Sequence, residues 1–182
     1  MQYESYGPYD THAIHGDSIR SRSVWRGAAA GVVGGLVASW VMTQFQSAMS
    51  KPSQKSQPQP SSESGDDATV KTANKISESA AGHTLTSEEK KVAGPLVHYV
   101  FGSAMGAVYG ALAEAAPVTT RGWGLPFGTA LWFGADEVAV PALKLAKPPA
   151  EYPASTHASA LAAHLVYGAT TEGVRRAVRA IM

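Results

Sequence analysis

Three histidines and two adjacent carboxylates lie within apolar stretches of this chain that carry almost no other charge. They are His98, Asp136, Glu137, His157 and His164. Histidine changes its charge between about pH 5 and 8, and a neighbouring carboxylate moves that change. A charge inside a membrane span costs roughly 2.5 to 3.5 kcal/mol, so such groups usually face a bundle interior or a cavity. Gathered in one place, these side chains would form a protonatable site.

Three interpretations of this polar group stay open. Its members could form hydrogen bonds between helices that fix helix register, or a proton relay or proton sensor. They could also bind a metal, because histidine and carboxylate ligands suit zinc or non-haem iron. His157 and His164 share a helical face, but seven residues at about 1.5 Å each separate them by roughly 10 Å. One ion would therefore need ligands from other helices.

The sequence contains no phosphate-binding loop, dinucleotide fingerprint or hydrolase motif. We therefore predict no catalytic residues, no bound cofactor and no enzymatic activity, with a metal-dependent membrane enzyme as the remaining enzymatic alternative. Two further acids, Glu114 and Glu172, lie at the other end of the apolar stretches, near Arg121, Arg175 and Arg176. We expect these acids to pair with arginines or to reach water.

Four low-charge segments rich in glycine and alanine must position these side chains. They are Gly27 to Ser50, Val92 to Ala113, Gly122 to Leu143 and Tyr152 to Thr171. Each has about the 20 residues that a helix needs to cross the roughly 30 Å of a bilayer core. Every arginine lies before the first segment, between the second and third, or after the fourth, and every lysine lies in the other two connections. Four crossings of a bilayer explain this sorting; a soluble helical bundle, the alternative, does not.

We therefore predict an all-α fold, a transmembrane bundle of four helices. The expected parts are a disordered polar tail at 1–23, a first span at 24–50, a polar loop with short amphipathic helices at 51–91, and three more spans with a basic C-terminus at 92–182. Lys51 to Ser64 reads as a linker too polar to order itself. Whether the rest of the loop folds onto the bundle is left open.

The polar loop carries local helix signals. Asp66 or Asp67 is expected to cap a helix that stops at Gly82. Thr86 and Glu89 have the spacing of a capping box, which predicts the start of a second short helix. It would lead to Pro95, in the first turn of the second span.

Small residues recur every four positions along the predicted spans. They are Gly27, Gly31 and Gly35 in the first, Gly102, Gly106 and Gly110 in the second, Gly124 and Gly128 in the third, and Gly168 in the fourth. In lipid, helices associate by close packing through such residues. The stripes predict a tight bundle, formed either within one chain or between copies in a homo-oligomer.

Charge and targeting signals indicate the surroundings of the chain. A net charge of +1 spread over several connections gives no nucleic-acid footprint. Residues 1–23 contain three acids and no apolar core, so they do not form a signal peptide. Arginine-flanked ends with Trp25 and Trp123 at the same face favour both termini in the cytoplasm. The expected partner is the lipid bilayer of a bacterial inner membrane.

The second half of the chain resembles the YagU-like bacterial inner-membrane family. The resemblance rests on GPLVHYVFGSAMGAVYGAL (94–112), GWGLPFGTALWFGADEVAVPALKLAKPPAEYP (122–153) and the following HASALAAHLVYGATTEGVRR. The first span and ATVKTANKIS (68–77) are similar more loosely. It implies a small multi-pass membrane protein without established biochemical activity, and the family's name carries an association with acid resistance. No catalytic or binding residues come with it.

Together these observations predict a membrane protein linked to acid or envelope stress through the protonatable group. The alternative is a structural or accessory subunit that packs against a membrane-protein partner through its glycine stripes.

Overall fold

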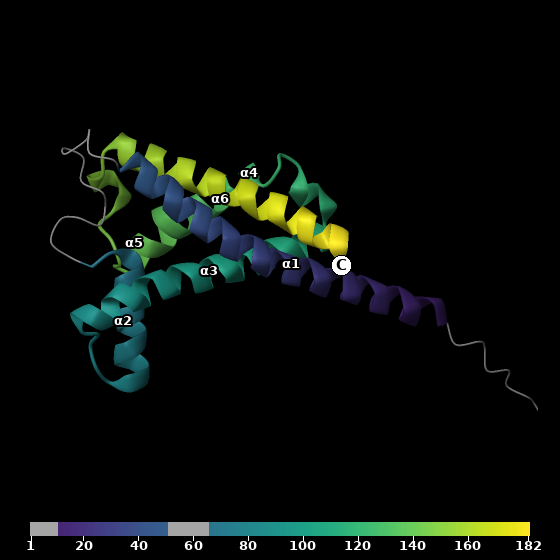
Figure 1. Ribbon diagram of the computed structural model, residues 1–182, viewed down its shortest axis with the longest axis horizontal. Helices are drawn as coiled ribbons and strands as arrows, with labels where there is room; N and C mark the ends of the chain where they lie inside the picture. Colours follow the sequence, from purple (N-terminus) through teal and green to yellow (C-terminus); the bar gives the residue numbers. More distant parts are fainter. Residues whose placement is uncertain (1–10, 51–65) are drawn as a thin grey trace, which may run out of the picture.

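The computed structural model describes residues 11–50 and 66–182, with side chains from Ser23 onward. This part of the chain consists of helices and turns, which confirms the predicted all-α class. The elements are α1 (Thr11–Met49), α2 (Ala68–Ala81), α3 (Ser87–Ala115), η1 (Pro117–Thr120), α4 (Leu125–Trp132), the π-helical segment η2 (Phe133–Ala139), α5 (Val140–Ala142), η3 (Pro149–Glu151) and α6 (Ala154–Ile181). Helices α1, α3 and α6 run alongside one another, and α2 lies at one end of them (Figure 1).

Glycines on α1 and α3 face each other in three successive pairs. Gly27 lies against Gly110, Gly31 against Gly106 and Gly35 against Gly102. The residue number rises on one helix as it falls on the other, so the two helices are antiparallel. A methyl group added at Gly102 would overlap the Ser39 side chain, and one added at any of the other five positions would overlap the backbone of the opposite helix. These stripes therefore meet within one chain, which decides a point that the sequence left open.

The other helix pairs approach with the same closeness. Gly124 and Gly128 lie against the backbone of Gly168 and His164, which makes the α4 to α5 run antiparallel to α6. Gly34 of α1 lies against the backbone of Thr171. A small apolar core between α1 and α6 contains Ala38, Met42, Ala163 and Tyr167. The chain therefore makes four passes of alternating direction, as in an up-and-down helical bundle.

The predicted helix signals of the polar loop are confirmed. Asp67 caps α2 and accepts a hydrogen bond from the Val70 N–H, and Gly82 ends the helix with a left-handed φ of 72°. Thr86 and Glu89 form the reciprocal capping box at the start of α3. Local sequence determines these ends, because each needs only side chains within three or four residues.

Three predicted boundaries differ from the structure. Helix α1 begins at Thr11, not after residue 23, since extending an existing helix adds one hydrogen bond for each residue fixed. The second short helix and the second span are one continuous helix, α3. Pro95 consequently lies inside that helix instead of in its first turn, where it removes one backbone hydrogen bond. The predicted linker at 51–64 lies outside the described residues.

Helix α2 packs on the bundle through α3 and the turn after α5. The Lys71 and Lys75 ammonium groups donate hydrogen bonds to the carbonyls of Leu145 and Leu143, at 2.9 and 2.7 Å. A cation at a helix C-terminus is favourable because the carbonyls there carry partial negative charge. The part of the polar loop that the structure describes thus folds onto the end of the bundle.

Two helical stretches in the described chain, Ser23–Met49 and Ser87–Ala115, are long and apolar enough to cross a membrane. The third and fourth predicted spans are helical as well, but neither has both properties. The third is divided among α4, η2 and α5 and contains two acids, and α6 carries three arginines and a glutamate in its second half. Four membrane crossings therefore remain a prediction.

In the described part of the chain, the bundle exposes many large apolar side chains and buries two charged ones, an arrangement that we call reversed polarity. Large apolar side chains such as Leu96 and Trp40 are more than half exposed, whereas Glu172 and Thr171 are fully buried. Arg175 is also buried. Charged residues are almost never buried in soluble proteins unless they are paired.

The contact between α1 and α3 can be tested at Gly106. We expect Gly106→Ala to lower the free energy of unfolding by about 1 to 3 kcal/mol, because its methyl group would overlap the Gly31 carbonyl. Thermal unfolding followed by circular dichroism in detergent measures this. Gly173→Ala is the matched control, since nothing lies within 4 Å of a methyl group there. Equal melting temperatures for the two variants would contradict the packing described.

Candidate functional site

The π-helical segment directs two neighbouring carboxylates toward α6. Asp136 and Glu137 both lie in this segment. A π turn is wider than an α turn, so successive side chains are separated by a smaller angle. Pro141 lies one turn further on and has no N–H, so it cannot bond the carbonyl four residues before it. The Val140 N–H, next to it, bonds the Ala135 carbonyl, which gives the wider π turn. The proline and the π-helical hydrogen bonds therefore lie in the same segment as Asp136 and Glu137.

His157 forms hydrogen bonds through both of its ring nitrogens. Nδ1 lies 2.6 Å from Oε1 of Glu137, and Nε2 lies 3.1 Å from the Pro149 carbonyl oxygen. Both partners are acceptors when Glu137 is ionised. Only the protonated imidazole has an N–H on each nitrogen, so this geometry favours the charged form of His157.

The second histidine forms a looser pair with the other carboxylate. His164 Nδ1 lies 3.7 Å from Oδ2 of Asp136 and 3.0 Å from the Ala160 carbonyl oxygen. The His164 side chain is 10% exposed and that of Asp136 is 38% exposed. Within this pair, the His164 side chain is therefore more deeply buried than the Asp136 side chain.

His98, the fifth member of the predicted group, lies on α3. Its Nε2 lies 3.4 Å from the Ser39 carbonyl oxygen of α1. The structure thus forms two histidine–carboxylate pairs from four of the five predicted residues, and the fifth, His98, contacts the backbone of α1. Among the side chains of residues 23–50 and 66–182, no three from histidine, aspartate or glutamate are placed to hold one metal ion. The metal interpretation has no geometric support there.

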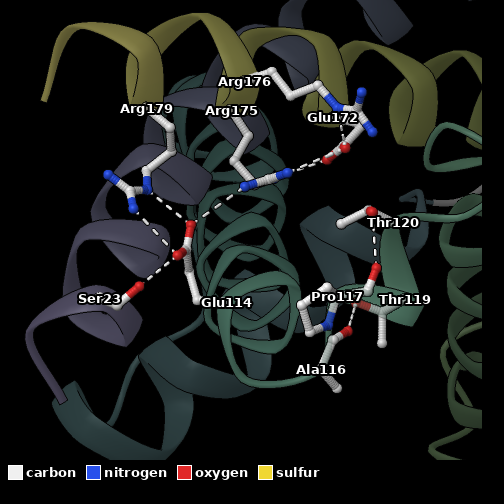
Figure 2. A network of polar contacts seen from close by, with 10 residues as sticks. All are labelled: Ser23, Glu114, Ala116, Pro117, Thr119, Thr120, Glu172, Arg175, Arg176 and Arg179. Atoms are coloured by element: carbon white, nitrogen blue, oxygen red, sulfur yellow. Dashed lines mark hydrogen bonds and ion pairs between the residues drawn. The ribbon is translucent and has the colours of Figure 1, made fainter. Parts of the chain in front are cut away.

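A second polar cluster lies at the opposite end of the bundle (Figure 2). Glu114 of α3 accepts two hydrogen bonds from Arg179 of α6, at 2.7 and 3.1 Å, and one from the Ser23 hydroxyl of α1. Arg175 lies 3.5 Å from the same carboxylate. These bonds raise the pKa of the Arg179 guanidinium above its usual value, so it stays charged. Glu114 therefore connects three helices.

Glu172 is the buried member of this cluster. Its carboxylate accepts hydrogen bonds from Arg175, at 2.8 and 3.1 Å, and from Arg176. The Arg176 guanidinium also lies 4.4 Å above the Trp123 ring. The predicted pairing of both glutamates with arginines is confirmed, and Arg179 takes part as well.

Sequence reasoning missed several buried polar groups between the two clusters. The Tyr167 hydroxyl donates a 2.6 Å hydrogen bond to the Gly102 carbonyl. Ser39 Oγ, the Tyr109 hydroxyl and Trp132 Nε1 are buried without a hydrogen-bond partner of normal geometry in the described protein. In the sequence, Ser39 follows Gly27, Gly31 and Gly35 at the same spacing of four residues. A polar side chain in line with a glycine stripe was the one available signal.

The paired charges of Glu172 can be tested by removing its charge alone. We expect Glu172→Gln to destabilise the protein by about 3 kcal/mol or more, because it removes the buried carboxylate that accepts two hydrogen bonds from buried Arg175. Glu88→Gln is the control, since the exposed Glu88–Lys91 pair is worth less than about 1 kcal/mol. Thermal unfolding in detergent compares them. A Glu172→Gln protein as stable as the control variant would contradict the role assigned to this cluster.

Comparison with known proteins places most of the site in one family. Residues 76–173 match the model of a family described as "Protein of unknown function (DUF1440)", which is more than half of the chain. The match includes both histidine–carboxylate pairs, His98, Glu114 and Glu172. Comparison with curated proteins and with solved structures found no match. The resemblance to YagU-like proteins therefore stays a prediction, whereas the chain belongs to the DUF1440 family, whose function is unknown.

Proposed function

We propose that this protein is a multi-pass bacterial inner-membrane protein whose bundle holds a protonatable site, used in the response to acid or envelope stress. The reversed polarity of the bundle supports the membrane setting. Apolar side chains cover the outside of α1 and α3, and the charged groups lie between helices. The separation of arginines from lysines also fits four crossings.

The contact between His157 and Glu137 carries the proposal of a protonatable site. An imidazolium with both N–H groups bonded, 2.6 Å from a carboxylate, is a group poised to exchange a proton with its partner. His164 and Asp136 repeat the pairing two turns deeper on α6. Two such pairs and His98 provide several protonation states within one half of the bundle.

The alternative, a subunit that binds a partner through its glycine stripes, loses its main support. Those stripes are occupied by helices of the same chain, so a partner would have to use another face. A homo-oligomer joined through other faces remains compatible with the proposal. A metal-dependent enzyme would need three convergent ligands, which the described side chains of residues 23–50 and 66–182 do not place together.

Cysteine labelling can test the number of crossings, because the chain has no cysteine of its own. Single variants Ser79→Cys, Thr119→Cys and Ala150→Cys are labelled with a membrane-impermeant maleimide in intact and permeabilised spheroplasts. Four crossings put residues 79 and 150 on one side and residue 119 on the other. If only α1 and α3 cross, residue 150 lies on the same side as residue 119, and the four-span proposal is wrong.

Proton flux can test the site. Proteoliposomes under an imposed pH gradient should conduct protons, and Asp136→Asn should reduce the rate about tenfold or more, because an amide does not ionise. Glu151→Gln, at an exposed acid of η3 near the same end, should conduct like the unaltered protein. Flux equal to that of empty liposomes in the unaltered protein would contradict the proposal.

A further inference from the structure

Arg176 is held in place on two sides but keeps part of its guanidinium free. Its Nε donates to the buried Glu172 carboxylate (Figure 2), and its Cζ lies 4.4 Å above the Trp123 ring. The side chain is still 45% exposed. Within residues 23–50 and 66–182, neither of its Nη nitrogens has a hydrogen-bond partner. The guanidinium is thus positioned in advance, with donors left for an acceptor outside the protein.

A second arginine lies on the neighbouring turn. Arg121 is two residues before Trp123, and it is exposed. Its side chain has no partner among the described residues. The sequence also contains no acid between Glu114 and Asp136. Both arginines near Trp123 therefore have donors that the protein itself does not use.

This end of the bundle carries an excess of positive charge. The three arginines of α6 outnumber the two glutamates that they bind by one. Arg121 adds a further positive charge. The two carboxylates are mostly or fully buried and already accept hydrogen bonds from these arginines. The ligand that complements this surface is therefore an anion.

Apolar side chains are exposed beside the same arginines. Val118, Trp123 and Leu125 are each about half exposed. They lie on the connection between α3 and α4, as Arg121 does, or at its end. Tryptophan is enriched where lipid headgroups meet hydrocarbon. A ligand with an anionic head and an apolar tail matches both kinds of side chain.

Positions along the chain put these arginines at the level of lipid headgroups. Arg176 follows Thr171, the end of the fourth low-charge segment, by five residues, which is about 7 Å of helix. Arg121 directly precedes the third segment, which begins at Gly122. In a membrane, both arginines would therefore lie just outside the hydrocarbon.

We propose that Arg121, Trp123 and Arg176 form a binding site for the headgroup of an anionic phospholipid from the surrounding leaflet. This inference rests on the membrane setting of the proposed function, and it does not involve the protonatable site. The planar fork of arginine can bond phosphate oxygens through two N–H groups at once, which lysine does not reproduce. Val118 and Leu125 lie where the acyl chains begin.

Lipid binding to the purified full chain in mild detergent tests this site. Native mass spectrometry compares dioleoyl phosphatidylglycerol with dioleoyl phosphatidylcholine, which has the same acyl chains and phosphate but no net charge. We expect the unaltered protein to bind phosphatidylglycerol more tightly, and Arg121→Gln to weaken that binding about fivefold. Arg176→Lys should weaken it as well, because it keeps the charge but loses the fork.

Two controls separate the site from a general effect of charge or folding. Lys91→Gln removes one positive charge from an exposed residue at the opposite end of the bundle, and it should bind phosphatidylglycerol like the unaltered protein. Arg121→Gln should leave the melting temperature in lipid-free detergent unchanged, since Arg121 has no side-chain partner to lose. It therefore decides the matter even where Arg176→Lys lowers stability.

The outcomes separate this inference from the proposed function. Equal binding of the two lipids, or an equal loss in Lys91→Gln and Arg121→Gln, would overturn the headgroup site even where proton flux and four crossings are found. Displacement of the lipid by an equal concentration of inorganic phosphate would overturn it too, because the site would then take a free anion. A preference for phosphatidylglycerol that is lost in Arg121→Gln would support this site even where the protein conducts no protons.

Discussion

Direct backbone contact between α1 and α3 determines the depth of every polar group in this bundle. Three glycine pairs allow one register for the two antiparallel helices, because any side chain at these positions would separate them. That register puts Ser39 beside His98 at one end. At the other end it puts Ser23 beside Glu114. The two polar clusters therefore depend on residues that have no side chain.

The two clusters differ in what their charges can do. At one end, Glu114 and Glu172 are held by arginines, whose guanidinium groups do not lose their charge in proteins. That cluster is fixed and connects helices. At the other end the basic partners of the acids are histidines, a residue type whose side chain can be neutral or charged. The two polar clusters, about 22 Å apart along α6, thus contain basic groups of different kinds.

The reversed polarity of the bundle has different energetic consequences in water and in lipid. Buried charges are costly in a soluble core, and apolar side chains at the surface gain nothing in water. In lipid the same arrangement is favourable, since the apolar exterior meets hydrocarbon and the charges satisfy one another inside. The buried Glu172–Arg175 pair and the exposed Leu96 and Trp40 are two sides of this arrangement.

The sequence by itself determined the features that depend on neighbouring residues. The helical class, the caps at Asp67 and Thr86 and the pairing of Glu172 with the arginines that follow it could all be predicted from it. These features follow from helix periodicity and from side chains a few positions apart.

Only the tertiary structure decided how the helices pair and what lies between them. It joined the glycine stripes within one chain, widened the helix around Asp136 into a π turn and buried the Ser39 and Tyr109 side chains inside the bundle. A glycine stripe has the same sequence whether it packs against its own chain or against another. The helical spacing of residues also does not show where an α-helix changes to a π-helix. These outcomes depend on contacts between residues far apart in the sequence, which only packing selects.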